Sequence, residues 1–136
     1  MTTSTVDLLA AISTHLAEFE LPASASVCVA DAVSTPQVTV QLTCGTPPAI
    51  AQGLLAWADT LTEVSAEAWR VPEGDSVHLV VTGLLSDGAT IRAYGWMRVT
   101  DRSWSADLAP NATKKLPLAT LRHLATPGQA TDEVTL

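Results

Sequence analysis

Hydrophobic positions recur along this chain at two spacings, one typical of helices and one typical of strands. Residues 4–19 place apolar side chains three or four positions apart, which predicts an amphipathic helix. Ser4 and Asp7 stand three residues apart at its start, as in a capping box. The predicted buried stripe of this helix is Leu8, Leu9, Ile12, Leu16 and Phe19.

Two short runs with strict alternation follow, at 24–30 and 37–43. A period of two with β-branched residues predicts strands, and the segment DAVSTP between them predicts a turn. We therefore expect a first β-hairpin here.

Residues 47–69 return to helical spacing. Thr46 is a suitable N-cap, and Pro47 and Pro48 fit a first helical turn. The predicted core stripe is Leu54, Trp57, Ala58, Leu61, Val64, Ala68 and Trp69. Three carboxylates fall on the opposite side, those of Asp59, Glu63 and Glu67. Because carboxylates on one straight helix diverge, we interpret them as a solvated face and not as a cation site.

The strongest hairpin signal is Asp87-Gly88, between alternating runs at 76–85 and 90–99. A two-residue loop would mix apolar and polar side chains on both faces of this hairpin. A three-residue loop over 86–88, with Gly88 left-handed, sorts the two faces, so we favour it. The outward face then contains His78, Val80, Thr82, Arg92, Tyr94, Trp96 and Arg98.

The remaining pattern completes an α+β fold. Residues 103–108 are a candidate fifth strand and 110–115 are predicted as loop. Residues 117–125 are predicted as a short helix, with a strand at its start as the alternative. The resulting order, α-ββ-α-ββ(β)-α, predicts one antiparallel sheet of four to five strands with helices packed on one face. We expect one domain over 1–125 and a flexible tail over 126–136.

The composition indicates a folded, acidic protein. Apolar residues make up 47% of the 136 positions and charged residues 15%. The net charge of −7 repels phosphate backbones, so nucleic-acid binding is disfavoured. No basic segment followed by an apolar core starts the chain, and no apolar run approaches the ~18 residues of a membrane span. We therefore expect a cytoplasmic location without a membrane partner.

Residues able to do chemistry are few. Cys28 and Cys44 are too far apart for a metal knuckle or a redox motif, so we expect two reduced, structural thiols. His15 and His123 are predicted as surface or boundary residues. The chain contains no GxSxG elbow and no glycine-rich phosphate loop. We expect no catalytic residue, no metal and no cofactor.

The predicted binding surface lies on the outward face of the second hairpin. It consists of His78, Arg92, Tyr94, Trp96 and Arg98. Tyr, Trp and Arg are enriched at binding hot spots, and exposed aromatic rings also stack on ligands. Three interpretations stay open: a packing or homodimer face, a partner-protein surface, and a platform for a small ligand or a nucleic acid. We expect a non-enzymatic adaptor, chaperone-like or regulatory protein that forms a homodimer; the alternative is a ligand-binding or enzymatic domain that uses this face.

Two resemblances bear on this expectation. The stretch LLAWADTLTEVSAEAWRVPEGDSVHLVVTGLLSDGATIR, at 54–92, resembles small proteins of unknown function from high-GC actinobacteria, which implies no activity. The element order resembles the roadblock family of dynein light chains and their bacterial relatives, homodimeric scaffolds in small-GTPase regulation. It also resembles the acidic, dimeric type III secretion chaperones. The turn DAVSTP replaces the glycine-containing first hairpin of the roadblock family, and both likenesses in element order imply self-association without naming a site residue.

Overall fold

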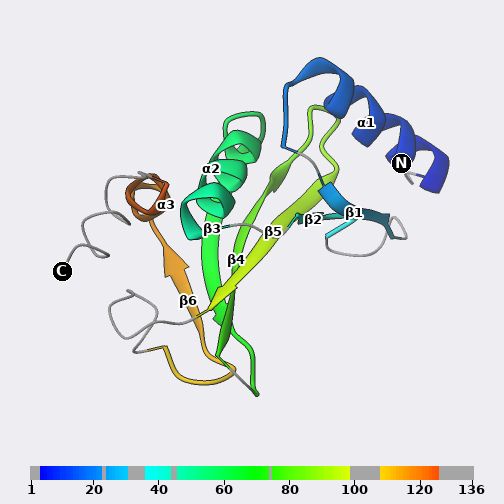
Figure 1. The fold of residues 1–136 in the computed structure, drawn as a ribbon. Coiled ribbons are helices and arrows are strands. Elements are labelled where there is room, and N and C mark those ends of the chain that lie inside the picture. The colour runs from blue at the N-terminus through cyan, green and yellow to red at the C-terminus, as the bar shows by residue number, and fades with distance from the viewer. Residues whose placement is uncertain are drawn as a thin grey trace.

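A computed structural model describes residues 4–22, 24–30, 36–43, 46–73, 75–98 and 108–125. Helices and strands in these segments form an α+β fold (Figure 1). In chain order the elements are α1 (Thr5–Glu18), β1 (Ser24–Val29), β2 (Val38–Leu42), α2 (Pro47–Ala58), β3 (Thr62–Arg70), β4 (Ser76–Leu84), β5 (Thr90–Arg98), β6 (Thr113–Leu116) and α3 (Leu118–Leu124).

The six described strands form one mixed sheet in the order β1-β2-β5-β4-β3-β6. Neighbouring strands are antiparallel, except that β2 runs parallel to β5. The predicted α+β class is confirmed, but the expectation of a purely antiparallel sheet of four to five strands is wrong. The parallel pair arises because the first hairpin joins the sheet along β5, a strand that lies far away in the sequence.

The hydrophobic core lies between the sheet and the helices, which gather on one side of it (Figure 1). α2 packs across β4 and β5, and α3 packs beside α2. α1 adds Leu8 and Ile12 to the same core. Helices on one face were predicted, and the arrangement leaves the other face of the sheet uncovered in the described part of the chain.

The first helix begins as predicted, but it buries a different set of side chains. Ser4 Oγ accepts a hydrogen bond from the Asp7 backbone, and Asp7 Oδ2 accepts one from the Ser4 backbone, which completes the capping box. Leu9 and Leu16 are 51% and 39% exposed, whereas His15 is only 4% exposed. The surface or boundary position expected for His15 is therefore wrong, because the core accommodates its ring.

The predicted long helix is two elements. α2 starts at the expected Thr46 cap but ends at Ala58, and β3 follows it. Residues 62–70 form a strand because β4 pairs with them on one side and β6 on the other. The three carboxylates therefore do not share one helix: they lie at the α2 C-cap, in a bulge of β3 and on β3 itself, in the order Asp59, Glu63 and Glu67.

The register of the β4–β5 hairpin agrees with the prediction. Leu85 N–H donates to the Ala89 carbonyl at 2.9 Å, so the loop holds three residues. Gly88 adopts a φ of 91°, the left-handed conformation that glycine tolerates best. His78 lies directly opposite Trp96. One hairpin face is thus buried against the helices and the other is turned away from them.

The C-terminal part differs in one element. Residues 113–116 form the edge strand β6 where a loop was predicted, while α3 confirms the short helix predicted over 117–125. β6 was missed because its side chains are mostly polar and exposed, so they carry no apolar alternation. The candidate strand at 103–108, apart from Leu108, the tail at 126–136 and Cys44 lie outside the described residues.

Candidate functional site

Aromatic and basic side chains gather on the uncovered face of the sheet, which we call the aromatic face. Successive side chains of a strand point to opposite faces, so alternate residues of β3, β4 and β5 share this one. It is made by Trp69, His78, Arg92, Tyr94 and Trp96. The structure thus places four of the five predicted binding residues together. The backbone of Arg98, the fifth, pairs with Ser76 at the end of β5.

Three rings of the aromatic face, those of Trp69, His78 and Tyr94, contact one another in a row. The His78 ring lies parallel to the Tyr94 ring, with centroids 5.3 Å apart and planes inclined by 11°. Trp69 meets His78 edge to face at 5.2 Å, and its Nε1 donates to Asn111 Oδ1. The Arg92 guanidinium lies 5.6 Å from the centroid of Tyr94, within range of a cation–π contact. These contacts hold the side chains in place before any partner arrives.

Trp96 is the exposed member of the aromatic face. Its side chain is 39% exposed, whereas Val80, on the same face and opposite Tyr94, is only 1% exposed. The larger neighbours therefore shield Val80 while Trp96 stays open to solvent. A large indole ring on a preorganised surface is a strong candidate for a binding anchor.

The electrostatics of the aromatic face favour an anionic group near Arg92. Burial lowers the pKa of His78 below its ordinary value of 6.5, and the charge of Arg92 lowers it further. His78 is therefore neutral at pH 7, and the positive charge of this cluster resides on Arg92. The buried Nε of Arg92 has no hydrogen-bond partner among the described residues. A carboxylate of a partner would pair with the positive charge of the Arg92 guanidinium.

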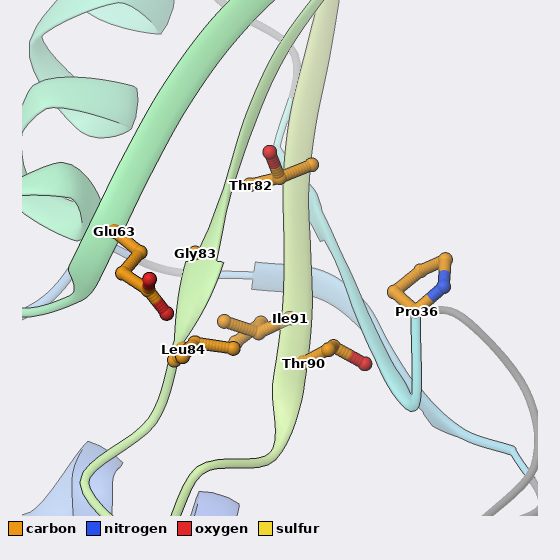
Figure 2. A pocket seen from close by; sticks show the side chains of 7 residues that line it. All are labelled: Pro36, Glu63, Thr82, Gly83, Leu84, Thr90 and Ile91. Atoms are coloured by element: carbon orange, nitrogen blue, oxygen red, sulfur yellow. The ribbon is translucent and has the colours of Figure 1, made fainter.

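A hollow of about 440 Å³ lies at one end of the same face (Figure 2). It is lined by Pro36, Glu63, Thr82, Gly83, Leu84, Thr90 and Ile91. Figure 2 shows the Glu63 side chain reaching from β3 toward Leu84 on β4. Glu63 has a φ of 52°, which is uncommon for a residue other than glycine, and the bulge at this point redirects its carboxylate. Thr82 lies opposite Arg92, so the hollow adjoins the aromatic face.

Other kinds of site are absent from the described segments. No group of three or more His, Cys, Asp or Glu side chains there is arranged to hold a metal ion. Nor does any helix of the described chain have the length and apolar character needed to cross a membrane. Cys28 is an exposed free thiol on β1, so the expectation of a structural thiol is wrong for this residue.

Sequence reasoning missed two residues of this region, Trp69 and Glu63. Trp69 was expected in the core because a helical period placed it there; β3 instead turns it to the aromatic face, where it is half-buried. The alternation of Val64, Ala66 and Ala68 with polar or aromatic neighbours was the signal for a strand. Glu63 carried no such signal, since a bulge follows from strand pairing and not from the local sequence.

His15 couples the stability of the fold to pH. Its ring stacks on Trp57 at 5.6 Å, and its Nε2 lies 2.8 Å from Thr60 Oγ1. The Thr60 hydroxyl donates to the Trp57 carbonyl, so it accepts from His15, which requires a proton on Nε2 of the neutral ring. Burial lowers the pKa of His15 below 6.5, and Glu18 opposes that shift only in part.

We therefore expect the free energy of unfolding to fall as the pH drops from 7.5 to 5.5. The unfolded chain, with a His pKa near 6.5, binds protons in this window more readily than the folded chain does. Urea titrations at a series of pH values measure this slope. His15→Gln and His78→Gln are each expected to flatten it, because the pKa of His78 is also lowered. An unchanged slope in both variants contradicts the assignment.

Comparison with protein-family models, with curated proteins and with solved structures found no match to this chain.

Proposed function

We propose that this chain is a small, non-enzymatic binding protein of the cytoplasm that works as a homodimer and holds a protein partner on its aromatic face. The observation that carries the proposal is the exposed Trp96 beside the His78 and Tyr94 rings and the charge of Arg92, whose Nε has no hydrogen-bond partner among the described residues. The role is that of an adaptor or regulator.

The chemistry of the aromatic face defines the partner. Trp96 offers a wide apolar contact, and Arg92 offers a charge held against Tyr94. A partner segment with an aromatic or aliphatic side chain next to a carboxylate satisfies both. Since the net charge of the whole chain is −7, Arg92 confers specificity for the carboxylate locally and not through long-range attraction.

Affinity capture from lysate of the source cells tests this proposal. We expect the wild type to retain a protein that Trp96→Ser and Arg92→Gln both lose by tenfold or more. Lys114→Gln is the matched control, because it removes one positive charge at an exposed position of β6, as Arg92→Gln does on the aromatic face. A partner retained equally by all variants, or no partner with this pattern, contradicts the proposal.

The hollow beside the aromatic face favours a second candidate function, the binding of a small ligand. Its volume of about 440 Å³ suits a small organic molecule, and the carboxylate of Glu63 favours a primary amine with an apolar body. A thermal-shift panel of such amines tests it. The expected result is a stabilising amine whose effect Glu63→Gln removes, and no stabilising amine contradicts it.

A further inference from the structure

Exposed apolar side chains concentrate at the end of the molecule formed by α1 and β1. Of the five large hydrophobic side chains exposed in the described residues, only Trp96 lies elsewhere. The other four are Val6, Leu9 and Leu16 of α1 and Val27 of β1. Concentrated apolar exposure of this kind marks an interaction surface and not random scatter.

The side of α1 that carries Leu9 and Leu16 is free of charge. Leu9 and Leu16 are seven residues apart, about two helical turns, so they lie on the same side of the helix. At about 100° per residue, Asp7 and Glu18 lie on the opposite side. Two copies of a chain with a net charge of −7 repel one another, and this carboxylate-free side is where they can approach.

β1 is an edge strand, and it carries no charged residue. Its sequence is SASVCV, and β2 is its only neighbour in the described sheet. The Ala30 N–H donates to the Gln37 carbonyl in the continuation of this pair. By the alternation of an antiparallel ladder, the backbone groups of Cys28 then point to β2, while those of Val27 and Val29 point to the free edge.

The opposite edge of the sheet, β6, is protected against pairing with another chain, and β1 lacks this protection. β6 is four residues long and exposes Lys114 and Lys115, and lysines on an edge strand oppose pairing with another chain. β1 has six residues, no proline and no lysine, and Val27 is 38% exposed. Its outer edge, which no described strand pairs with, is therefore suited to a further strand.

We propose that β1 is the interface of a homodimer, in which β1 of a second copy pairs antiparallel with it across a two-fold axis. This rests on the self-association included in the proposed function. An antiparallel pair of identical strands is self-complementary, as a two-fold interface requires. α1 contacts β1, so its exposed leucines lie at the same end of the molecule, and in this dimer they extend the apolar contact to the second copy.

The pairing has a geometric consequence for the aromatic face. A two-fold axis that joins two edges into one continuous antiparallel sheet stands perpendicular to that sheet. It reverses the strand direction and keeps each face on the same side. The two aromatic faces of the dimer therefore point the same way, and the helices of both copies lie together on the other side. Such a dimer presents two copies of the binding surface to one partner or to two adjacent ones.

Sedimentation velocity over a range of concentrations tests the interface. We expect the wild type to sediment at twice the mass of the chain and Val27→Lys to sediment as a monomer. Thr113→Lys is the matched control, since it adds the same charge to an exposed position on the opposite edge, and it is expected to stay dimeric. Leu9→Gln, on the exposed side of α1, is expected to weaken the dimer at least tenfold. Circular dichroism verifies that each variant is folded.

The outcomes separate this inference from the proposed function. A wild-type monomer at every concentration overturns the interface and the homodimer, but it leaves partner capture through Trp96 and Arg92 as an independent result. A dimer that survives Val27→Lys and dissociates with Trp96→Ser also overturns the inference, because it moves the interface to the aromatic face. Dissociation of the dimer in the Val27→Lys and Leu9→Gln variants alone supports the inference, whether or not a partner is captured.

Discussion

Replacement of Trp57 by alanine is expected to lower the free energy of unfolding by about 3–5 kcal/mol, the typical cost of removing a large aromatic side chain from a core. Trp57 is fully buried in α2, where the His15 ring stacks on it. The truncation leaves a cavity between α1 and α2 and removes the surface against which His15 packs. Urea denaturation followed by far-ultraviolet circular dichroism measures the loss without relying on tryptophan fluorescence.

Two controls separate the packing of Trp57 from its other properties. Trp96→Ala removes the same side chain from a position that is 39% exposed, so its effect is expected to be less than half that of Trp57→Ala. Trp57→Phe keeps most of the ring volume, and the lost Nε1 has no hydrogen-bond partner among the described residues. We therefore expect it to cost less than half as much as Trp57→Ala. Equal losses for the Trp57→Ala and Trp96→Ala variants are incompatible with the packing described above.

Gly95→Ala is expected to destabilise the fold by about 1–3 kcal/mol, the range of overpacked cores. A Cβ at this position lies only 2.7 Å from Ile50 Cγ2, so the methyl group forces β5 and α2 apart. The conformational entropy that alanine removes from the unfolded chain works in the other direction, by about 0.4–1 kcal/mol. The close approach of α2 to β5 therefore depends on the absence of a side chain at Gly95.

A double-mutant cycle with Ile50 identifies that contact as the cause. Ile50→Ala removes Cγ2, and the Cβ of residue 50 lies 3.7 Å from the added methyl group, an ordinary contact. Gly95→Ala is therefore expected to cost at least 1 kcal/mol less in the Ile50→Ala background. Ile50→Val retains Cγ2 and is expected to leave the cost unchanged. Relief of equal size in both backgrounds, measured by urea denaturation, argues against a steric origin.

Local sequence patterns correctly predicted those features whose structure is determined by residues close by in the sequence. The capping box of α1, the proline-rich start of α2 and the loop at Asp87-Gly88 were all recognised, because each is defined within a few residues. The boundary between α2 and β3 was not, since Val64 and Ala68 fit a helical period as well as a period of two. Strands β4 and β6 on either side decide between these two structures, and both lie later in the chain.

In the candidate site, too, the residues placed by local sequence were predicted and those placed by tertiary contacts were not. The hairpin register placed His78, Arg92, Tyr94 and Trp96 on one face, and the structure places them there. Trp69 completes the row of rings only because β3 pairs with β4, so its contribution depends on tertiary structure. The buried position of His15 likewise depends on Thr60 and Trp57, which meet it from a distant part of the chain.

The parallel pair of β2 and β5 has a consequence for the order of folding. β3, β4 and β5 are consecutive and antiparallel, so they can form through contacts between neighbouring segments. β2 reaches β5 only when residues such as Val38 and Ile91 close a loop that contains α2, β3 and β4. Because closing a long loop costs entropy before its contacts form, we expect the first hairpin to dock late, onto a nucleus already built by the later strands.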